Sequence, residues 1–420
     1  MEREFLQRGD FTMQKNKEYI ERVWAEIDLD RMIESCRVIR EQIVPAGTKL
    51  MAVLKSDAYG HGAAYLAPVL ERECGVDWFA VACLAEAIEL RKNGVEKPVL
   101  ILGLTDPRYA SLLSKYSLTQ TVGCLDYAQQ LDRCAKQDAV QVNCHIKINT
   151  GMNRLGFDSL GDQTRMGRTV EEILSAFSLQ NLHFNGMFSH LYHSLTYDEQ
   201  SKQECYEQYR RFVMIRNQLA ERGFQVDLCH LCNTGGAINY PELSMDMVRV
   251  GSLIYGLRGV CPGEIQKRIP PLKPIFQLKS RIAMIRTVLP GECVGYSSSY
   301  IAKRKTRVAV VSCGYTDGYS RRNSNQGVLL VRGKRVPVIG NICMDMMMAD
   351  ITEVEDACVG DLVTIYGRDG TEEISCGEAA VYAGTIEPEI TTVISRRVPR
   401  LYFRDGKLIH VEDRLLEGDF

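Results

Sequence analysis

A lysine ends an apolar run in the segment Val53-Leu54-Lys55-Ser56-Asp57-Ala58-Tyr59-Gly60-His61-Gly62. Met51 to Leu54 has strand character, two glycines bracket a turn, and an apolar helix is predicted over Ala63 to Leu70. An ammonium group at the mouth of a buried strand must be paired, solvated or neutralised. An amine with a lowered pKa can condense with a carbonyl to form a Schiff base. The alternative is a strand-end lysine that extends into solvent. Tyr59 is close enough in sequence to share the site.

The elements that would position this lysine repeat along the chain. Short apolar runs alternate with amphipathic stretches at intervals of about thirty residues. The runs are Leu50–Leu54, Trp78–Cys83, Pro98–Leu104, Leu118–Val122, Val140–Ile148, Leu182–His190, Val226–Cys232 and Met247–Tyr255. Apolar runs without alternation, each followed by a helix, indicate a parallel sheet covered on both faces. Eight such units predict a (β/α)8 TIM-like barrel, with 197–222 as its clearest covering helix.

Polar residues stand at the carboxyl ends of these runs. Lys55, Lys147, His190, Asn233 and Thr234 lie at or just past the ends, and Arg249 lies within the last run. Because the carboxyl-terminal face of such a barrel holds the active site, we expect these side chains to converge there. A buried arginine needs an acceptor, and a carboxylate partner inside the barrel is the plain structural explanation for Arg249.

The pattern changes from about Pro271. Short Val- and Ile-rich runs are separated by Pro-Gly, Arg-Gly-Lys and Arg-Asp-Gly turns, which predicts a mainly antiparallel β-domain. Val23–Ile27 is a short predicted strand, and a helix is predicted over 28–44. The fold class is therefore α/β: a lead-in over 1–20, a barrel over 21–270 and a β-strand C-terminal domain over 271–420.

Composition narrows the functional class. The chain has 420 residues and a net charge of −2, which argues against a nucleic-acid partner. No apolar run approaches the ~20 residues of a membrane span, and 1–19 lack a signal-peptide core; we expect a cytoplasmic protein. Its 15 cysteines are interpreted as reduced. Cys229-His230-Leu231-Cys232 lacks a second ligand pair, so no metal site is predicted.

The segment Lys55–Gly62 resembles the pyridoxal-phosphate lysine motif of the alanine racemase family. The resemblance extends in order over residues 22–405. It implies an isomerase that uses pyridoxal 5'-phosphate to interconvert L- and D-alanine, supplying D-alanine for cell-wall peptidoglycan. It also implies a homodimer with shared active sites.

The resemblance further implies roles for individual residues. Lys55 and Tyr296, the latter across the dimer interface, would be the two catalytic bases that racemisation requires on opposite faces of the substrate. Arg249 would face the cofactor's pyridine nitrogen, and Lys147 is a candidate for carbamylation, although Asn149 stands where an aspartate is expected. The residues implied in cofactor binding are Lys55, Tyr59, Arg154, His190, Asn233, Thr234, Arg249, Gly251 and Ser252. Those implied in substrate binding are Arg154, Tyr315, Met344 and Asp345.

One departure from the family pattern keeps other activities open. Pro388 in Thr385-Ile386-Glu387-Pro388-Glu389 replaces a tyrosine that touches the phosphate and borders the substrate in the family. A serine or broader-specificity racemase is therefore an alternative. Further alternatives are a barrel-type pyridoxal-phosphate decarboxylase of basic amino acids, against which the Tyr296 and Cys343-Met344-Asp345 motifs speak, and a non-catalytic pyridoxal-phosphate carrier, which would lack the β-domain.

Overall fold

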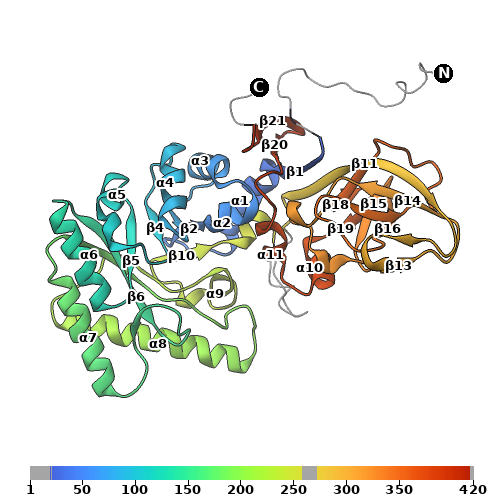
Figure 1. Cartoon of the computed structure of the whole chain (residues 1–420). Coiled ribbons are helices and arrows are strands. Elements are labelled where there is room, and N and C mark those ends of the chain that lie inside the picture. Colours follow the sequence, from blue (N-terminus) through green and yellow to red (C-terminus); the bar gives the residue numbers. More distant parts are fainter. Residues whose placement is uncertain (1–18, 20, 258–271, 417–420) are drawn as a thin grey trace. The chain divides into compact units, whose positions relative to one another are not determined.

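The computed structural model describes residue 19 and residues 21–257 and 272–416. The chain forms two compact units. The first, which we call the barrel unit, comprises Asp28–Gln277 and Glu373–Ile394. The second, the β-unit, takes in the described parts of Met1–Ile27 and Ser395–Phe420 together with Leu278–Glu372 (Figure 1).

Parallel strands form the centre of the barrel unit, in the order β10-β2-β3-β4-β5-β6-β8-β9. They are β2 (Lys49–Val53), β3 (Trp78–Val81), β4 (Val99–Ile101), β5 (Thr119–Val122), β6 (Val142–Asn149), β8 (Leu182–Phe188), β9 (Cys229–His230) and β10 (Met247–Val250). The short β7 (Phe157–Asp158) pairs with β6. The ring nearly closes beyond β9, where the Arg249 N–H donates to the Cys232 carbonyl at 3.0 Å. The eight apolar runs and the barrel predicted from the sequence are confirmed.

Helices cover the outside of the barrel (Figure 1). They are α1 (Leu29–Gln42), α3 (Ala63–Glu73), α4 (Leu84–Lys92), α5 (Ala110–Lys115), α6 (Leu125–Gln137), α7 (Gln163–Phe177) and α8 (Glu199–Glu221). Capping side chains mark where two of them begin, because the first backbone N–H groups of a helix have no partner within it. Asp28 accepts from the Arg31 N–H at 3.0 Å, and Asp198 accepts from the Ser201 N–H at 2.7 Å. The two helices predicted over 28–44 and 197–222 are confirmed as α1 and α8.

Apolar side chains from several strands meet inside the ring. One buried cluster comprises Met51, Val53, Ala80, Leu100, Phe188, Leu228 and Met247. It leaves the strands' inward faces packed rather than open, as in other barrels of this kind. The polar groups that carry chemistry are therefore held at the carboxyl ends of the strands.

The β-unit is built on an antiparallel sheet, as predicted. Its members include β1 (Val23–Asp28), β11 (Phe276–Val288), β14 (Thr306–Val311), β15 (Val328–Val331), β16 (Lys334–Pro337), β17 (Met347–Asp350), β18 (Leu362–Asp369), β19 (Glu372–Ile374), β20 (Arg400–Arg404) and β21 (Lys407–Glu412). The sheet runs β16-β15-β18-β11-β1-β20-β21, with β14 beside β11. A small hairpin joins β12 (Cys293–Val294) to β13 (Tyr300–Ile301).

The two units exchange segments, which the predicted domain boundaries miss. β1, assigned to the barrel from the sequence, lies between β11 and β20 in the sheet of the β-unit. Helices α10 (Cys376–Ala383) and α11 (Glu387–Thr392), assigned to the β-domain, belong to the barrel unit. The predicted boundary at 270–271 and nearly all of the predicted lead-in lie outside the described residues.

Two further observations concern the described part of the chain. Its fourteen cysteines are all free, including Cys229 and Cys232, which are buried. None of its helices combines the length and the apolar character that crossing a membrane would require.

Candidate active site

A cavity of about 230 Å³ opens at the carboxyl ends of the barrel strands. Its lining brings together most of the barrel residues singled out from the sequence. It is lined by Val53, Lys55, Tyr59, Leu102, Lys147, Arg154, Leu155, Phe188, His190, Leu195, Asn233, Thr234, Gly235, Arg249, Gly251 and Ser252. The convergence of side chains from separate strands on one mouth is the geometry expected of a barrel active site.

Lys55 opens an unusual turn, α2 (Lys55–Gly60), directly after β2. The four residues from Ser56 to Tyr59 have φ of 53°, 57°, 52° and 56°, so the turn is left-handed although none of them is glycine. Left-handed backbone costs roughly 1–2 kcal/mol per residue for L-amino acids. Neighbouring contacts must therefore hold it. The Ser56 N–H donates to Glu86 Oε1 at 2.7 Å, and the Asp57 carboxylate accepts from the Ala63 N–H at 2.8 Å.

Two glycine-dependent contacts complete this turn. Gly60 has φ of +85°, and a Cβ there would meet the Thr391 carbonyl oxygen of α11 at 2.0 Å. Gly251 follows β10, and a Cβ there would meet the Tyr59 hydroxyl at 2.5 Å. The turn therefore lies against α11 on one side, and Tyr59 reaches the backbone beyond β10 on the other.

The Lys55 amine is half-buried in the cavity wall. Burial lowers its pKa, the positive charge of Arg154 lowers it further, and Glu86 opposes both. No hydrogen bond joins the Lys55 amine to another described residue. A lysine amine with a lowered pKa and no fixed partner is available as a nucleophile or as a base at neutral pH.

Arg249 is buried and is held entirely by neutral acceptors. Its guanidinium donates to His230 Nδ1 at 2.7 Å, to the Ser189 carbonyl at 2.7 Å and to the Leu231 carbonyl at 2.9 Å. It also lies 3.2 Å from His190 Nδ1. Burial lowers the pKa of Arg249 to about 10. The carboxylate partner considered from the sequence is absent from these contacts, so that explanation is wrong.

The protonation of the histidines follows from this arrangement, because a guanidinium can only donate. His230 accepts at Nδ1, so its proton is on Nε2, which donates to His145 Nδ1 at 3.2 Å. His190 lies between two donors, Arg249 at 3.2 Å from its Nδ1 and Asn233 Nδ2 at 3.3 Å from its Nε2, and a neutral ring accepts from only one of them. Burial, followed by the nearby Arg249 charge, lowers the pKa of both His190 and His230 well below the ordinary value. Both rings are neutral at physiological pH.

Lys147, on β6, is the second buried amine of the site. Its Nζ lies 4.4 Å from the centre of the Phe188 ring, and no hydrogen bond to a described residue satisfies it. Burial lowers its pKa well below the ordinary value, and Arg249 and Arg154 lower it further. The amine therefore loses its proton at a lower pH than an ordinary lysine amine does, and the neutral form is the nucleophile.

A hydroxyl and close-packed backbone form one wall of the cavity. Asn233 caps α9 (Thr234–Asn239), and its Oδ1 accepts from the Gly236 N–H at 3.0 Å. Thr234 Oγ1 accepts from the Gly251 N–H at 3.2 Å. Tyr59 borders the same wall, and burial raises its pKa to about 12, so its hydroxyl stays protonated. The wall offers neutral donors to an anionic group.

The charges of the lining are one-sided. Among the described residues that line the cavity, the ionisable groups besides Tyr59 and His190 are Lys55, Lys147, Arg154 and Arg249, and none is Asp or Glu. This donor set fits pyridoxal phosphate, which carries a dianionic phosphate and a carbonyl that condenses with an amine.

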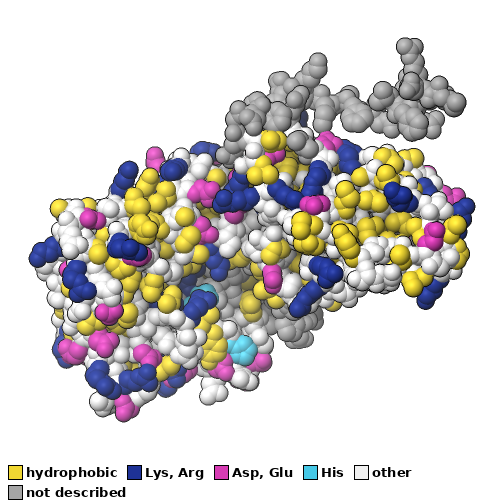
Figure 2. Space-filling view, viewed as in Figure 1, with side chains coloured by type: hydrophobic (Ala, Val, Ile, Leu, Met, Phe, Trp, Pro, Cys, Tyr) yellow, Lys and Arg dark blue, Asp and Glu magenta, His cyan; other side chains and the backbone are white. Residues whose placement is uncertain are grey.

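The remaining predicted residues lie in the β-unit. Thr316 Oγ1 donates to the Met344 carbonyl at 2.7 Å, and the Tyr315 N–H donates to the Cys343 carbonyl at 3.1 Å, so the segments of Tyr315 and Met344 adjoin. Asn341 Nδ2 donates to the Tyr296 carbonyl at 2.9 Å. Tyr296 is 69% exposed and Met344 is 52% exposed. Figure 2 shows many hydrophobic side chains on the surface of this unit in the view drawn.

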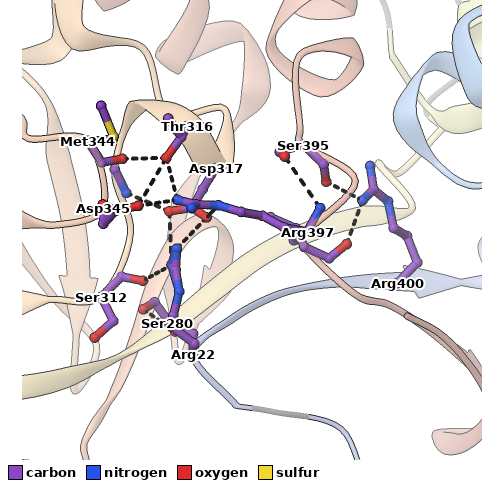
Figure 3. Close-up of polar contacts among 12 residues, drawn as sticks. Arg22, Ser280, Ser312, Thr316, Asp317, Met344, Asp345, Ser395, Arg397 and Arg400 are labelled. Carbon is purple, nitrogen blue, oxygen red and sulfur yellow. Dashed lines mark hydrogen bonds and ion pairs between the residues drawn. The ribbon is translucent and has the colours of Figure 1, made fainter. Parts of the chain in front are cut away.

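A buried carboxylate organises these segments, as Figure 3 shows. Asp317 is fully buried and accepts from Arg22 Nη2 at 2.6 Å and from Arg397 Nε at 2.7 Å. Arg397 also donates to Asp345 Oδ1 at 2.7 Å. Two arginines on one buried carboxylate fix the loops that carry Thr316 and Asp345.

Several residues of this scaffold were not found from the sequence. Each of them contacts a residue that is distant in sequence; they are Glu86, His230, Arg397 and Gln208 of α8. Only His230 carried a signal, as a histidine within the predicted run Val226–Cys232. Pro388 lies in the first turn of α11 and does not line the cavity.

The fold and the cavity together define a barrel enzyme whose site is built around a reactive lysine and a cationic lining. Comparison with known proteins agrees with that class. Residues 27–259 match the alanine racemase N-terminal domain and residues 275–402 match the alanine racemase C-terminal domain. The chain therefore belongs to the alanine racemase family, and it is an isomerase.

Individual relatives cover nearly the whole chain. Alanine racemase 1 of Clostridium acetobutylicum is 36% identical over 395 residues, which is 94% of this chain and 99% of the relative. The alanine racemase structure from Clostridium difficile 630 has a TM-score of 0.86 at 33% identity, covering 95% of this chain and 100% of that one. The structure from Bartonella henselae with covalently bound pyridoxal phosphate has a TM-score of 0.78 at 24% identity, covering 91% and 100%, and shows the shared fold.

Proposed function

We propose that the protein is a pyridoxal-phosphate-dependent racemase that interconverts L- and D-alanine and supplies D-alanine for peptidoglycan. The observation that carries the proposal is a cavity in which Lys55, with a lowered pKa, is surrounded by Lys147, Arg154 and Arg249, with no carboxylate among its described lining residues. Family membership supports the choice of substrate. The cytoplasmic location inferred from the sequence stays a prediction.

Residues of the barrel unit would hold the cofactor. Lys55 would bind it covalently, and Thr234, Gly251, Ser252 and Tyr59 would receive its phosphate. The bound cofactor withdraws electrons from the substrate's α-carbon and makes the α-proton acidic. Arg249 would face the ring nitrogen. Because a guanidinium rarely gives up its proton, and its other donors are engaged by His230 and two carbonyls, it would leave that nitrogen unprotonated. A weaker electron sink favours rapid return of the proton over side reactions.

Racemisation needs proton transfer on both faces of the α-carbon. We assign one face to Lys55, whose lowered pKa leaves part of the amine free to take a proton. We assign the other face to Tyr296 of the partner subunit in a homodimer with shared sites. The exposure of Tyr296 and Met344 supports this assignment, because large apolar side chains gathered on a surface mark an interaction site. Arg154, Tyr315, Met344 and Asp345 are the residues that would bind the substrate.

Lys147 would be carbamylated. Its neutral amine can attack carbon dioxide, forming an N–C bond and releasing one proton. The resulting carbamate would place a negative charge beside Arg154 and Arg249, whose positive charges act on Lys147. A buried charge is stabilised by such pairing.

Chiral analysis tests the proposed function. The purified protein with added cofactor is incubated with each L-amino acid, and the expected result is D-alanine as the main product. Borohydride reduction followed by peptide mapping should place the label on Lys55. Release of carbon dioxide from ornithine, lysine or arginine without racemisation would favour the decarboxylase instead, and no turnover of any amino acid would favour the carrier.

A further inference from the structure

Gln208 is a buried amide of α8, and its three hydrogen bonds all go to two loops of the site. It is 1% exposed. Its Nε2 donates to Thr150 Oγ1 at 2.9 Å and to the His190 carbonyl at 3.0 Å. Its Oε1 accepts from the Tyr192 N–H at 3.1 Å. Thr150 begins the loop after β6, and the other two residues belong to the loop after β8.

The chain of hydrogen bonds continues beyond Gln208. Because the Thr150 hydroxyl accepts from Gln208, it is free to donate to Ser189 Oγ, 2.8 Å away. Ser189 Oγ in turn donates to the Ile148 carbonyl at 2.7 Å. Thr150 and Ser189 are both 1% exposed, so water does not compete for these bonds. This chain of hydrogen bonds, which we call the relay, thus runs from Gln208 through Thr150 and Ser189 to a backbone carbonyl of β6.

Each end of the relay leads directly to a group in the cavity. The Ser189 carbonyl is one of the acceptors that hold Arg249, at 2.7 Å. His190 follows Ser189, and its ring lies against Arg249. On the other side, Thr150 precedes the short stretch that carries Arg154, which lines the cavity. A second residue of α8 supports the same loop, since Arg211 Nη1 donates to the Thr150 carbonyl at 3.1 Å.

We propose that Gln208 is a positioning residue: its amide sets the spacing between the loop that carries Arg154 and the loop that carries His190. Replacement by an apolar residue removes the partner of the Thr150 hydroxyl, the His190 carbonyl and the Tyr192 N–H, so the two loops lose the hydrogen bonds that fix their spacing. A shift of about 1 Å at reacting groups can cost about 100-fold in rate. The kinetic part of this inference rests on the proposed racemase function; the structural part does not.

The variant is Gln208→Met, which keeps the length of the side chain and removes its donors and acceptor. The matched control is Gln218→Met on the same helix, because among the described residues the Gln218 amide hydrogen-bonds only to the Met166 sulfur, at 3.7 Å, and to no loop of the site. Gln208→Asn serves as a second variant, since it retains a polar amide that is too short to reach both loops. Melting temperature identifies which variants fold.

Two readouts are measured on the holoenzyme. Hydrogen exchange followed by mass spectrometry should become faster in peptides covering residues 148–156 and 189–195 of Gln208→Met and Gln208→Asn, and remain unchanged in Gln218→Met. The KM for alanine should rise and kcat/KM should fall about 10- to 100-fold, with less than a twofold change in the control.

The inference is overturned if the exchange of both peptides and the KM match the parent, or if Gln218→Met changes them equally. If the parent protein does not racemise alanine, the proposed function fails, and the exchange measurement alone still decides the role of Gln208.

Discussion

Glu86→Gln should loosen the turn that presents Lys55. The Glu86 carboxylate accepts from the Ser56 N–H and from the Ala82 N–H, both at 2.7 Å. Hydrogen bonds to a charged group contribute about 1.5–3 kcal/mol each. Glutamine has one carbonyl oxygen, so it retains one neutral bond, worth about 0.5–1.5 kcal/mol, and turns its NH₂ group toward the other N–H. The expected net loss is about 2–4 kcal/mol of local stability.

That loss is comparable with the free-energy cost of the turn's left-handed backbone. Four left-handed residues together cost roughly 4–8 kcal/mol, and their neighbours must offset this cost. Amide exchange at residues 56–60 should therefore accelerate about 30- to 1,000-fold, since each 1.36 kcal/mol corresponds to tenfold. Because Glu86 raises the Lys55 pKa, its neutralisation should also lower that pKa further. In the apoprotein, chemical labelling of Lys55 should then reach half-maximum at a lower pH than in the parent.

Glu71→Gln is the matched control for this experiment. Its carboxylate also accepts two backbone N–H groups, from Glu96 and Lys97, and it is absent from the charges that act on Lys55. It should leave the exchange of 56–60 and the labelling of Lys55 unchanged. The reasoning is refuted if Glu86→Gln changes the exchange at 56–60 by less than threefold, or if both variants change it equally.

Three further predictions address the proposed chemistry. Tyr296→Phe should make α-proton exchange in deuterated water strongly unequal between L- and D-alanine. The control Tyr300→Phe should leave the two exchange rates balanced. Equal residual exchange of both enantiomers in Tyr296→Phe would mean that Tyr296 is not one of the bases. With ¹³C-labelled bicarbonate, the parent should show one protein carbamate signal, which increases with pH. Lys147→Ala should lose this signal, whereas the control Lys49→Ala, which changes an exposed side chain, should keep it. A signal that survives in Lys147→Ala would assign the carbamate to another residue. Pro388 does not line the cavity, but the longer side chain of Pro388→Tyr should reach it. Once shown to fold, this variant should widen the alanine-to-serine ratio of kcat/KM, because a tighter pocket discriminates by about 1–3 kcal/mol. An unchanged ratio would mean that position 388 does not set specificity.

Much of the barrel could be predicted because its signals are local. An unbroken apolar run such as Leu50–Leu54 can only be buried on both faces, and a helix must follow it before the next parallel strand. The convergence of Lys55, His190 and Arg249 at one mouth followed from strand direction alone. The sequence did not predict that β1 belongs to the β-unit, or that α10 and α11 belong to the barrel unit. These segments contact residues hundreds of positions away, and the hydrophobic pattern of a segment does not indicate which distant segment it packs against.

The site shows the same limit. Gly60 and Gly62 marked a turn, but Ser56-Asp57-Ala58-Tyr59 does not indicate four left-handed residues in a row, since only Asp57 is of a type enriched in that region. Gln208 lies in an amphipathic helix where a glutamine ordinarily faces solvent, and only the loops above it explain its burial. The neutral acceptors of Arg249 were hidden for a further reason, because two of the three closest are backbone carbonyls, which every residue possesses.

The contact between Gly60 and Thr391 has a consequence for the order in which the chain is completed. About 330 residues separate Gly60 from the start of α11. At about 5–20 residues per second, a ribosome needs roughly 15–65 s to synthesise them. Once β10 has been synthesised, the eight strands can form their ring in the remaining part of that interval, yet the turn that presents Lys55 still lacks the backbone against which Gly60 packs. A nascent barrel is therefore assembled well before its lysine is held in place.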